Sequence, residues 1–149
     1  MKKYLDMAFI EAKKAFDLDE IPVGCVIVHK NEVIACGHNE KESKNSAIRH
    51  AEMVAIDIAC GKLNSWRLDE CELYVTLEPC MMCMGAIVES RIKNVYFGAK
   101  NNSEQMYDYR RVSKLVNLYF LDDTDCSKIL SDFFANKRKK WCLYLYFVL

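Results

Sequence analysis

The sequence predicts an α/β protein, a three-layer α/β/α domain built on a five-stranded mixed sheet. Three observations support this prediction: an N-terminal segment with apolar residues at helical spacing, a β-hairpin pattern after it, and strands that alternate with helices from residue 72 onward. Strands joined through helices are expected to form right-handed crossovers that cover both faces of a sheet. At 149 residues, one domain with a substantial core is expected.

The N-terminal third supplies one helix and two strands. Residues 3–17 carry apolar side chains every three or four positions, which predicts an amphipathic helix. Residues 24–29 and 33–37 are short apolar runs joined by Lys30-Asn31-Glu32, and this pattern is typical of a hairpin with a tight turn. Residues 39–47 are polar and are expected to form a loop.

The remaining two thirds alternate between helix and strand. We expect, in order, a helix over 50–60 that ends at Gly61 as its C-cap, a strand over 72–77, a helix over 79–89 opened by Pro79, a strand over 94–98, an irregular loop or weak helix over 100–114, a strand over 115–121 and a helix over 125–139. No internal repeat, low-complexity tract or linker interrupts this order.

Charge and cysteine usage limit the class of protein. Lys plus Arg balances Asp plus Glu at 21 each, so overall charge predicts neither nucleic-acid nor membrane binding. Asp6 and Glu11 interrupt the N-terminal helix, so it is not a secretory signal, and we expect a cytoplasmic protein whose eight cysteines stay reduced. Six of them stand singly and are expected to act as small buried hydrophobic residues: Cys25, Cys36, Cys60, Cys71, Cys126 and Cys142.

The other two cysteines, Cys80 and Cys83, form a C-x-x-C. A structural zinc knuckle, a dithiol redox pair and part of a catalytic metal site all use this spacing. A structural zinc ion needs four protein ligands, and no second close pair follows in the sequence. With His50 as third ligand the fourth position stays open to water, which is the catalytic form of a zinc site. A redox pair or a non-enzymatic zinc module would leave the nearby Glu52 without a purpose.

His50 and Glu52 can point into one site only if His50 lies at the entry of the helix, before its regular part. Residues two apart on a regular helix point in nearly opposite directions, so a core histidine beside a solvent-facing glutamate is the alternative. Convergence requires His50 to lie at the helix entry. The N-terminus of the expected helix over 79–89 favours the thiolates of Cys80 and Cys83. Together the two motifs match the H-x-E…P-C-x-x-C signature of zinc nucleobase deaminases.

Longer stretches resemble one family. "HAEM", "LYVTLEPCMMCMGAI", "SRIKNVYFGA" and "LSDFF" closely resemble bacterial tRNA adenosine deaminases of the cytidine-deaminase-like superfamily, as do "IPVG" and "GHN". The resemblance runs from about Tyr4 to Lys140 and implies a zinc-dependent deaminase domain over residues 1–140. It also implies a homodimer with one zinc ion per subunit. The implied reaction converts the wobble adenosine of a tRNA anticodon loop to inosine.

The resemblance assigns roles to particular residues. The implied zinc ligands are His50, Cys80 and Cys83, and Glu52 is the implied proton shuttle. The implied substrate-binding groups are the side chain of Asn39 and the backbone of Ala51. The implied nucleic-acid contacts are Asn101 and the basic residues of the final helix, Lys137, Arg138 and Lys140, for which a solvated helix end is the alternative.

Three departures from the family affect substrate choice. Arg49 replaces a small residue beside a ligand, and we expect it to point outward rather than reach a substrate phosphate. Asn101 stands where aspartate is typical, so an acceptor for a ribose hydroxyl is hypothesised to be lost. Residues 141–149 form an apolar extension too short to span a membrane, and we expect a strand or packed segment that covers apolar surface rather than a membrane partner.

A rival function shares the same metal site. A deaminase of a free nucleobase or nucleoside, such as guanine, cytosine or a related purine, would use the same ligands and sheet. "LSDFF" and the basic final helix favour tRNA, whereas the altered loop 101–106 and the neutral net charge favour the rival.

Overall fold

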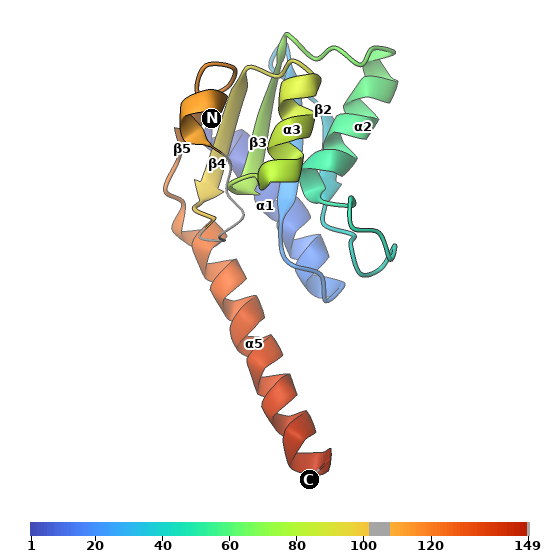
Figure 1. The fold of residues 1–149 in the computed structure, drawn as a ribbon, viewed down its shortest axis with the longest axis vertical. Coiled ribbons are helices and arrows are strands. Elements are labelled where there is room, and N and C mark those ends of the chain that lie inside the picture. Colours follow the sequence, from blue (N-terminus) through green and yellow to red (C-terminus); the bar gives the residue numbers. More distant parts are fainter. Residues whose placement is uncertain (102–107, 149) are drawn as a thin grey trace.

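The computed structural model describes the backbone of residues 1–101 and 108–148, and the side chains in these ranges except those of 109 and 140–148 (Figure 1). The altered loop at 102–106 therefore lies outside the described residues. The elements are α1 (Lys2–Asp17), β1 (Gly24–His29), β2 (Glu32–His38), α2 (Ala51–Leu63), β3 (Cys71–Leu77), α3 (Met81–Glu89), β4 (Asn94–Ala99), α4 (Tyr109–Val112), β5 (Asn117–Phe120) and α5 (Thr124–Val148).

One mixed sheet organises the chain, as predicted. Its strand order is β2-β1-β3-β4-β5. Strand β1 pairs antiparallel with both β2 and β3, and β3, β4 and β5 run parallel to one another. Because α3 connects the parallel strands β3 and β4, its first turn begins at the carboxyl edge of the sheet, where sites in such folds form.

Alternate side chains of each strand pack against different helices. Cys25 and Ile27 of β1 belong to the core beneath α2 and α3, whereas Val26 and Val28 pack on the opposite face with α1. Figure 1 shows the same layers, with α2 and α3 in front of the sheet and α1 behind it. This period of two defines the three-layer α/β/α arrangement.

Two glycines allow helices to lie directly on the sheet. A Cβ at Gly24 would lie 2.0 Å from the Ala8 carbonyl oxygen of α1. A Cβ at Gly37 would lie 2.5 Å from the Ala51 carbonyl oxygen at the start of α2. Gly37 is therefore the reason that the first turn of α2, which carries the predicted site residues, can sit against β2.

The end of α2 and the start of α3 differ from the sequence expectation. Helix α2 continues past Gly61 to Leu63 and is capped by Asn64, whose φ of 48° and ψ of 41° are left-handed. Asparagine tolerates this conformation, so the helix does not need a glycine to end. Helix α3 begins at Met81 rather than at Pro79, with Cys80 as its N-cap.

The C-terminal segment continues a helix. Helix α5 extends through residues 141–148, so the expected strand there is wrong (Figure 1). No proline or glycine falls between residues 124 and 148 to interrupt the helix. Strand β5 is shorter than expected, and the short α4 is the weak helix predicted within 100–114. Among the described residues, no helix is both long and apolar enough to cross a membrane.

Candidate active site

The candidate site lies between the first turns of α2 and α3. His50 is the N-cap of α2, with extended backbone angles of φ −78° and ψ 156°. Cys80 is the N-cap of α3 and is also extended, at φ −75° and ψ 174°. Because His50 precedes the regular helix, it escapes the angular spacing that would turn it away from Glu52. The local condition required for convergence is therefore met.

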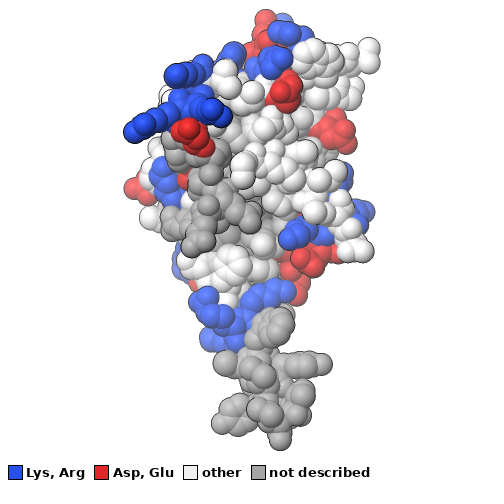
Figure 2. Space-filling view, viewed as in Figure 1, with Lys and Arg blue, Asp and Glu red and all other residues white. Residues whose placement is uncertain are grey.

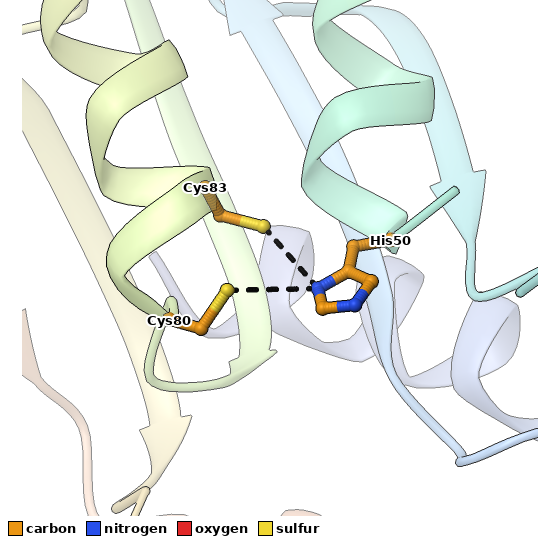
Figure 3. Close-up of side chains that lie close together, drawn as sticks. All are labelled: His50, Cys80 and Cys83. Carbon is orange, nitrogen blue, oxygen red and sulfur yellow. Dashed lines mark hydrogen bonds between the residues drawn. The ribbon is translucent and has the colours of Figure 1, made fainter. Parts of the chain in front are cut away.

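The side chains of His50, Cys80 and Cys83 meet at one point (Figure 3). His50 Nδ1 lies 3.6 Å from Cys80 Sγ and 3.5 Å from Cys83 Sγ. One ligand atom from each residue lies within 4.8 Å of the others, so this group could hold a metal ion. Cys83 is buried, while His50 and Cys80 are partly exposed toward the pocket side.

Mutual hydrogen bonding shifts the pKa values of the cluster. The hydrogen bond from the Cys83 thiol, with a further contribution from His50, lowers the pKa of Cys80 to about 4. The same pairing raises the pKa of Cys83 well above its usual range, and the hydrogen bond with Cys80 raises the pKa of His50. Cys80 thus favours the thiolate, which is the form that binds metals.

Glu52 is buried beside this cluster. It lies in the first turn of α2, is only 4% exposed and contacts the Cys83 thiol. Burial raises the pKa of Glu52 to about 7, because a carboxylate removed from water is destabilised relative to its neutral form. A carboxyl group with such a pKa can both accept and release a proton near neutral pH.

A pocket of about 220 Å³ opens onto the cluster. Three residues expected to contact substrate or nucleic acid, Asn39, Ala51 and Asn101, all line it together with His50, Glu52 and Cys80. Asn39 is 5% exposed, and its backbone N–H donates to the Val23 carbonyl oxygen at 3.1 Å. The structure thus brings these residues together, while their contacts with a substrate stay a prediction.

Sequence reasoning missed two charged residues of this pocket, Glu78 and Lys41. Glu78 is 2% exposed, and its Oε2 accepts a hydrogen bond from the Asn101 backbone N–H at 3.2 Å. The Asn101 side-chain amide donates to the Glu78 carbonyl oxygen at 3.4 Å. A charged residue directly before Pro79-Cys80 was the available signal for Glu78; Lys41 carried none beyond its closeness to Asn39.

Arg49 does not line the pocket and pairs with a carboxylate of its own loop. Its Nη2 and Nε donate to Glu40 Oε2 at 2.5 Å and 3.1 Å, and its side chain is 34% exposed. Whether Arg49 stays turned away from a substrate phosphate therefore remains a prediction. No local pattern in the sequence predicted its contact with a carboxylate nine residues earlier in the chain.

Lys137 and Arg138 of α5, the predicted basic contacts whose side chains are described, lie outside the pocket of the cluster. Lys137 forms an ion pair with Asp19 at 2.7 Å and lies 5.3 Å above the centre of the Phe133 ring. It lines a neighbouring pocket of about 550 Å³, and Ile21 is common to both pockets. Arg138 is exposed, and the side chain of Lys140 lies outside the described residues.

The other five cysteines whose side chains are described do not belong to the metal cluster. Every cysteine whose side chain is described is a free thiol. Cys25, Cys71 and Cys126 are buried as expected, whereas Cys36 and Cys60 are only partly buried.

An α/β fold that presents one histidine, two cysteines and a buried glutamate at two helix starts defines the class of metal-dependent nucleobase deaminases.

Known proteins place the chain within this class. A family model of MafB19-like deaminases matches residues 1–138. A tRNA-specific adenosine deaminase of Bacillus subtilis is 42% identical over 147 residues, covering 92% of this chain and 90% of the relative. The chain therefore belongs to the MafB19-like deaminase family and, within it, to the tRNA-specific adenosine deaminases.

Solved structures agree on the fold. A tRNA:A34 deaminase superposes with a TM-score of 0.81 at 34% identity, over 87% of this chain and 100% of that chain. A guanine deaminase from Bacillus subtilis superposes with a TM-score of 0.64 at 39% identity, over 66% of this chain and 64% of that chain. The predicted cytidine-deaminase-like fold is confirmed.

Proposed function

We propose that this protein hydrolyses adenosine to inosine at the wobble position of a tRNA anticodon loop. The observation that carries the proposal is the His50, Cys80 and Cys83 cluster, which lies with Glu52 beside one pocket in a fold that covers the whole of a tRNA:A34 deaminase. The reaction consumes one water and releases one ammonia.

The donor set supports zinc as the metal. One imidazole nitrogen and two thiols are ligands that zinc prefers, and they leave one of four tetrahedral positions open. Metal–sulfur and metal–nitrogen distances of about 2.3 Å and 2.0 Å at a tetrahedral angle separate nitrogen from sulfur by roughly 3.5 Å. The observed separations of 3.6 Å and 3.5 Å fit this requirement. When bound, zinc supplies Lewis-acid activation of water.

The residues of the chain carry the proton transfers and hold the base. Glu52 accepts a proton from the attacking water and delivers it to the adenine ring nitrogen next to the amino-bearing carbon. A second transfer through Glu52 protonates the amino group, which leaves as ammonia. Asn39 binds the nucleoside at the pocket wall, and the backbone of Ala51 meets the base edge. Burial of Glu52 keeps competing solvent away from the carboxyl group.

A second subunit is part of the proposal. Figure 2 shows an uncharged area over α3 and the neighbouring α2, and Met81 and Ile58 on these helices are 57% and 45% exposed. We infer that this face binds a second copy of the chain. Met81→Lys should convert the dimer to a monomer in light scattering after gel filtration; a monomeric parent protein would contradict the inference. Action on tRNA also implies a cytoplasmic location.

Ammonia release from a substrate panel tests the activity. The panel holds an anticodon stem–loop with adenosine at the wobble position, the same hairpin in DNA, free adenosine, adenine, guanine and cytosine. We expect the RNA stem–loop to be deaminated at least about 100-fold faster than any free base or nucleoside. Faster turnover of guanine would support the rival function, which the likeness to a guanine deaminase favours. Inductively coupled plasma analysis of the same preparation should find one zinc per chain.

A further inference from the structure

The loop from Asn39 to Arg49 connects two residues of the candidate site. It begins with Asn39 at the pocket wall and ends directly before His50 of the metal cluster. The loop is closed at its base, where the Glu40 backbone N–H donates to the Arg49 carbonyl oxygen at 2.9 Å. The side chains reinforce this closure, since Arg49 Nη2 and Nε both donate to Glu40 Oε2.

This closure restricts two site residues at once, because each residue of the pair is next to one of them in the chain. Glu40 follows Asn39, and Arg49 precedes His50. Consecutive Cα atoms lie only about 3.8 Å apart, so holding residue 40 against residue 49 restricts how far residue 39 can move from residue 50. The pair therefore limits the distance between the proposed substrate-binding asparagine and a candidate metal ligand, both of which line the pocket.

The far end of the loop is held independently. The carboxylate of Glu20, which is 1% exposed, accepts hydrogen bonds from the backbone N–H groups of Glu42 at 3.1 Å and Ser43 at 2.6 Å. The loop is thus anchored at its tip by Glu20 and at its base by the Glu40–Arg49 pair. Weakening the base leaves the tip in place, so its effect should concentrate on Asn39 and the adjoining Lys41, which also lines the pocket.

We propose that Glu40 and Arg49 are positioning residues that hold Asn39 at the substrate pocket relative to His50. Neither side chain lines the pocket, so the pair acts through its neighbours. Their side chains are 19% and 34% exposed, and this partial burial sets them apart from a solvent-exposed surface pair. The inference rests on the proposed function only for the identity of the substrate.

A charge-swap series tests the pair. Its members are the parent, Arg49→Ala, Glu40→Ala, and the double variant Glu40→Arg with Arg49→Glu, which keeps an ion pair of reversed direction. Arg67→Ala is the matched control, because Arg67 pairs with Asp69 through two hydrogen bonds of 3.0 Å and 2.8 Å away from the pocket. For each, kcat and KM are measured on whichever substrate of the panel the parent deaminates. Hydrogen–deuterium exchange is measured over residues 39–49.

Positioning predicts a specific pattern of kinetics. Arg49→Ala and Glu40→Ala should each raise KM about fivefold while kcat stays within about twofold, an effect at the lower end of couplings between contacting charged residues. The charge swap should restore KM to within about twofold of the parent. Exchange over residues 39–49 should quicken in the single variants and slow again in the swap, and Arg67→Ala should change neither quantity.

Two results would overturn the inference. An unchanged KM in Arg49→Ala would show that the pair is an idle surface contact. A swap as impaired as the single variants would show that each residue acts alone. Failure of the proposed function gives a different result: the parent would act on a free base instead of the stem–loop, and the same series on that base would still decide the role of the pair. If the parent deaminates nothing in the panel, unaltered exchange in Arg49→Ala would overturn the positioning role.

Discussion

Two buried glutamates in this molecule have pKa values that are shifted in opposite directions. Glu20, between α1 and β1, is 1% exposed, and Glu52, in the first turn of α2, is 4% exposed. Burial acts to raise the pKa of both. For Glu20 the amide hydrogen bonds from Ser43 and Glu42 outweigh burial and lower its pKa, whereas burial dominates at Glu52 and raises its pKa to about 7.

The difference shows that hydrogen-bond donors, and not burial alone, decide whether a buried carboxyl group is charged. Glu20 receives two backbone N–H groups from a loop and acts as a fixed anchor for it. Glu52 faces the thiol of Cys83 and keeps an acidity suited to proton transfer. The same residue type therefore serves structure in one region and, in our proposal, chemistry in the other.

Removal of the Cys83 thiol, which contacts Glu52, should have the largest effect on the candidate site. Cys83→Ala deletes a completely buried side chain that contacts both His50 and Glu52. We expect metal affinity to fall by more than about 100-fold, beyond the effect of losing an outer partner of a ligand, and deamination to disappear with it. Metal titration by isothermal calorimetry measures this. Cys71→Ala, at a buried cysteine outside the cluster, should keep full metal binding, and equal losses in both would refute the site.

An amide at position 52 removes the proton carrier and little else. Glu52→Gln should lower kcat by at least about 100-fold, the contribution of a general acid–base group, while zinc content and the unfolding midpoint stay near those of the parent. Single-turnover kinetics on the stem–loop measure the loss. Retention of more than about a hundredth of the rate would show that another group moves the proton.

The corresponding change at Glu20 should act on stability instead. Glu20→Gln loses the carboxylate that accepts both loop amides, so the free energy of unfolding should fall by roughly 1–3 kcal/mol. Urea denaturation measures this fall. Glu89→Gln, on an exposed glutamate, serves as control and should change it by at most about 0.5 kcal/mol. Similar stability in both variants would mean that the anchor contributes nothing.

The pH dependence of this effect has a defined sign. Because the folded protein lowers the pKa of Glu20 from its ordinary value of 4.5, its contribution is complete well above pH 4.5. The contribution is lost as the pH falls through the lower folded pKa. The stability difference between the parent and Glu20→Gln should therefore be constant near neutral pH and shrink below pH 4.5. A difference that grows on acidification would contradict the assigned charge state.

A solvent-exposed carboxylate gives the smallest effect. Asp19 pairs with Lys137, and their side chains are 59% and 35% exposed. Lys137→Ala should therefore change the free energy of unfolding by less than about 1 kcal/mol. If Lys137 contacts RNA, the slope of log affinity against log salt for the stem–loop should also fall by about one. Fluorescence anisotropy at several salt concentrations measures the slope, and an unchanged slope would exclude a phosphate contact.

Local patterns predicted most of the fold. The five strands, the major helices and the mixed sheet follow from apolar periodicity and the order of elements. The boundaries at Gly61 and at residues 141–148 were wrong for local reasons: Asn64 can cap a helix as glycine does, and the apolar tail contains nothing that ends α5. Contacts between segments that are distant in the chain were harder to predict than these local features.

The sequence by itself determined the donors of the candidate site. The ligand types follow from a histidine and a glutamate at one helix start and two cysteines at another, because the residue type alone gives the donor atoms of a side chain. The tertiary structure alone decided that His50 lies within 4 Å of both sulfurs, that Glu20 anchors the loop and that Arg49 folds back onto Glu40. The Glu20 contact depends on backbone N–H groups, which carry no residue-specific signal in the sequence. The other two depend on how the chain brings side chains of different segments together.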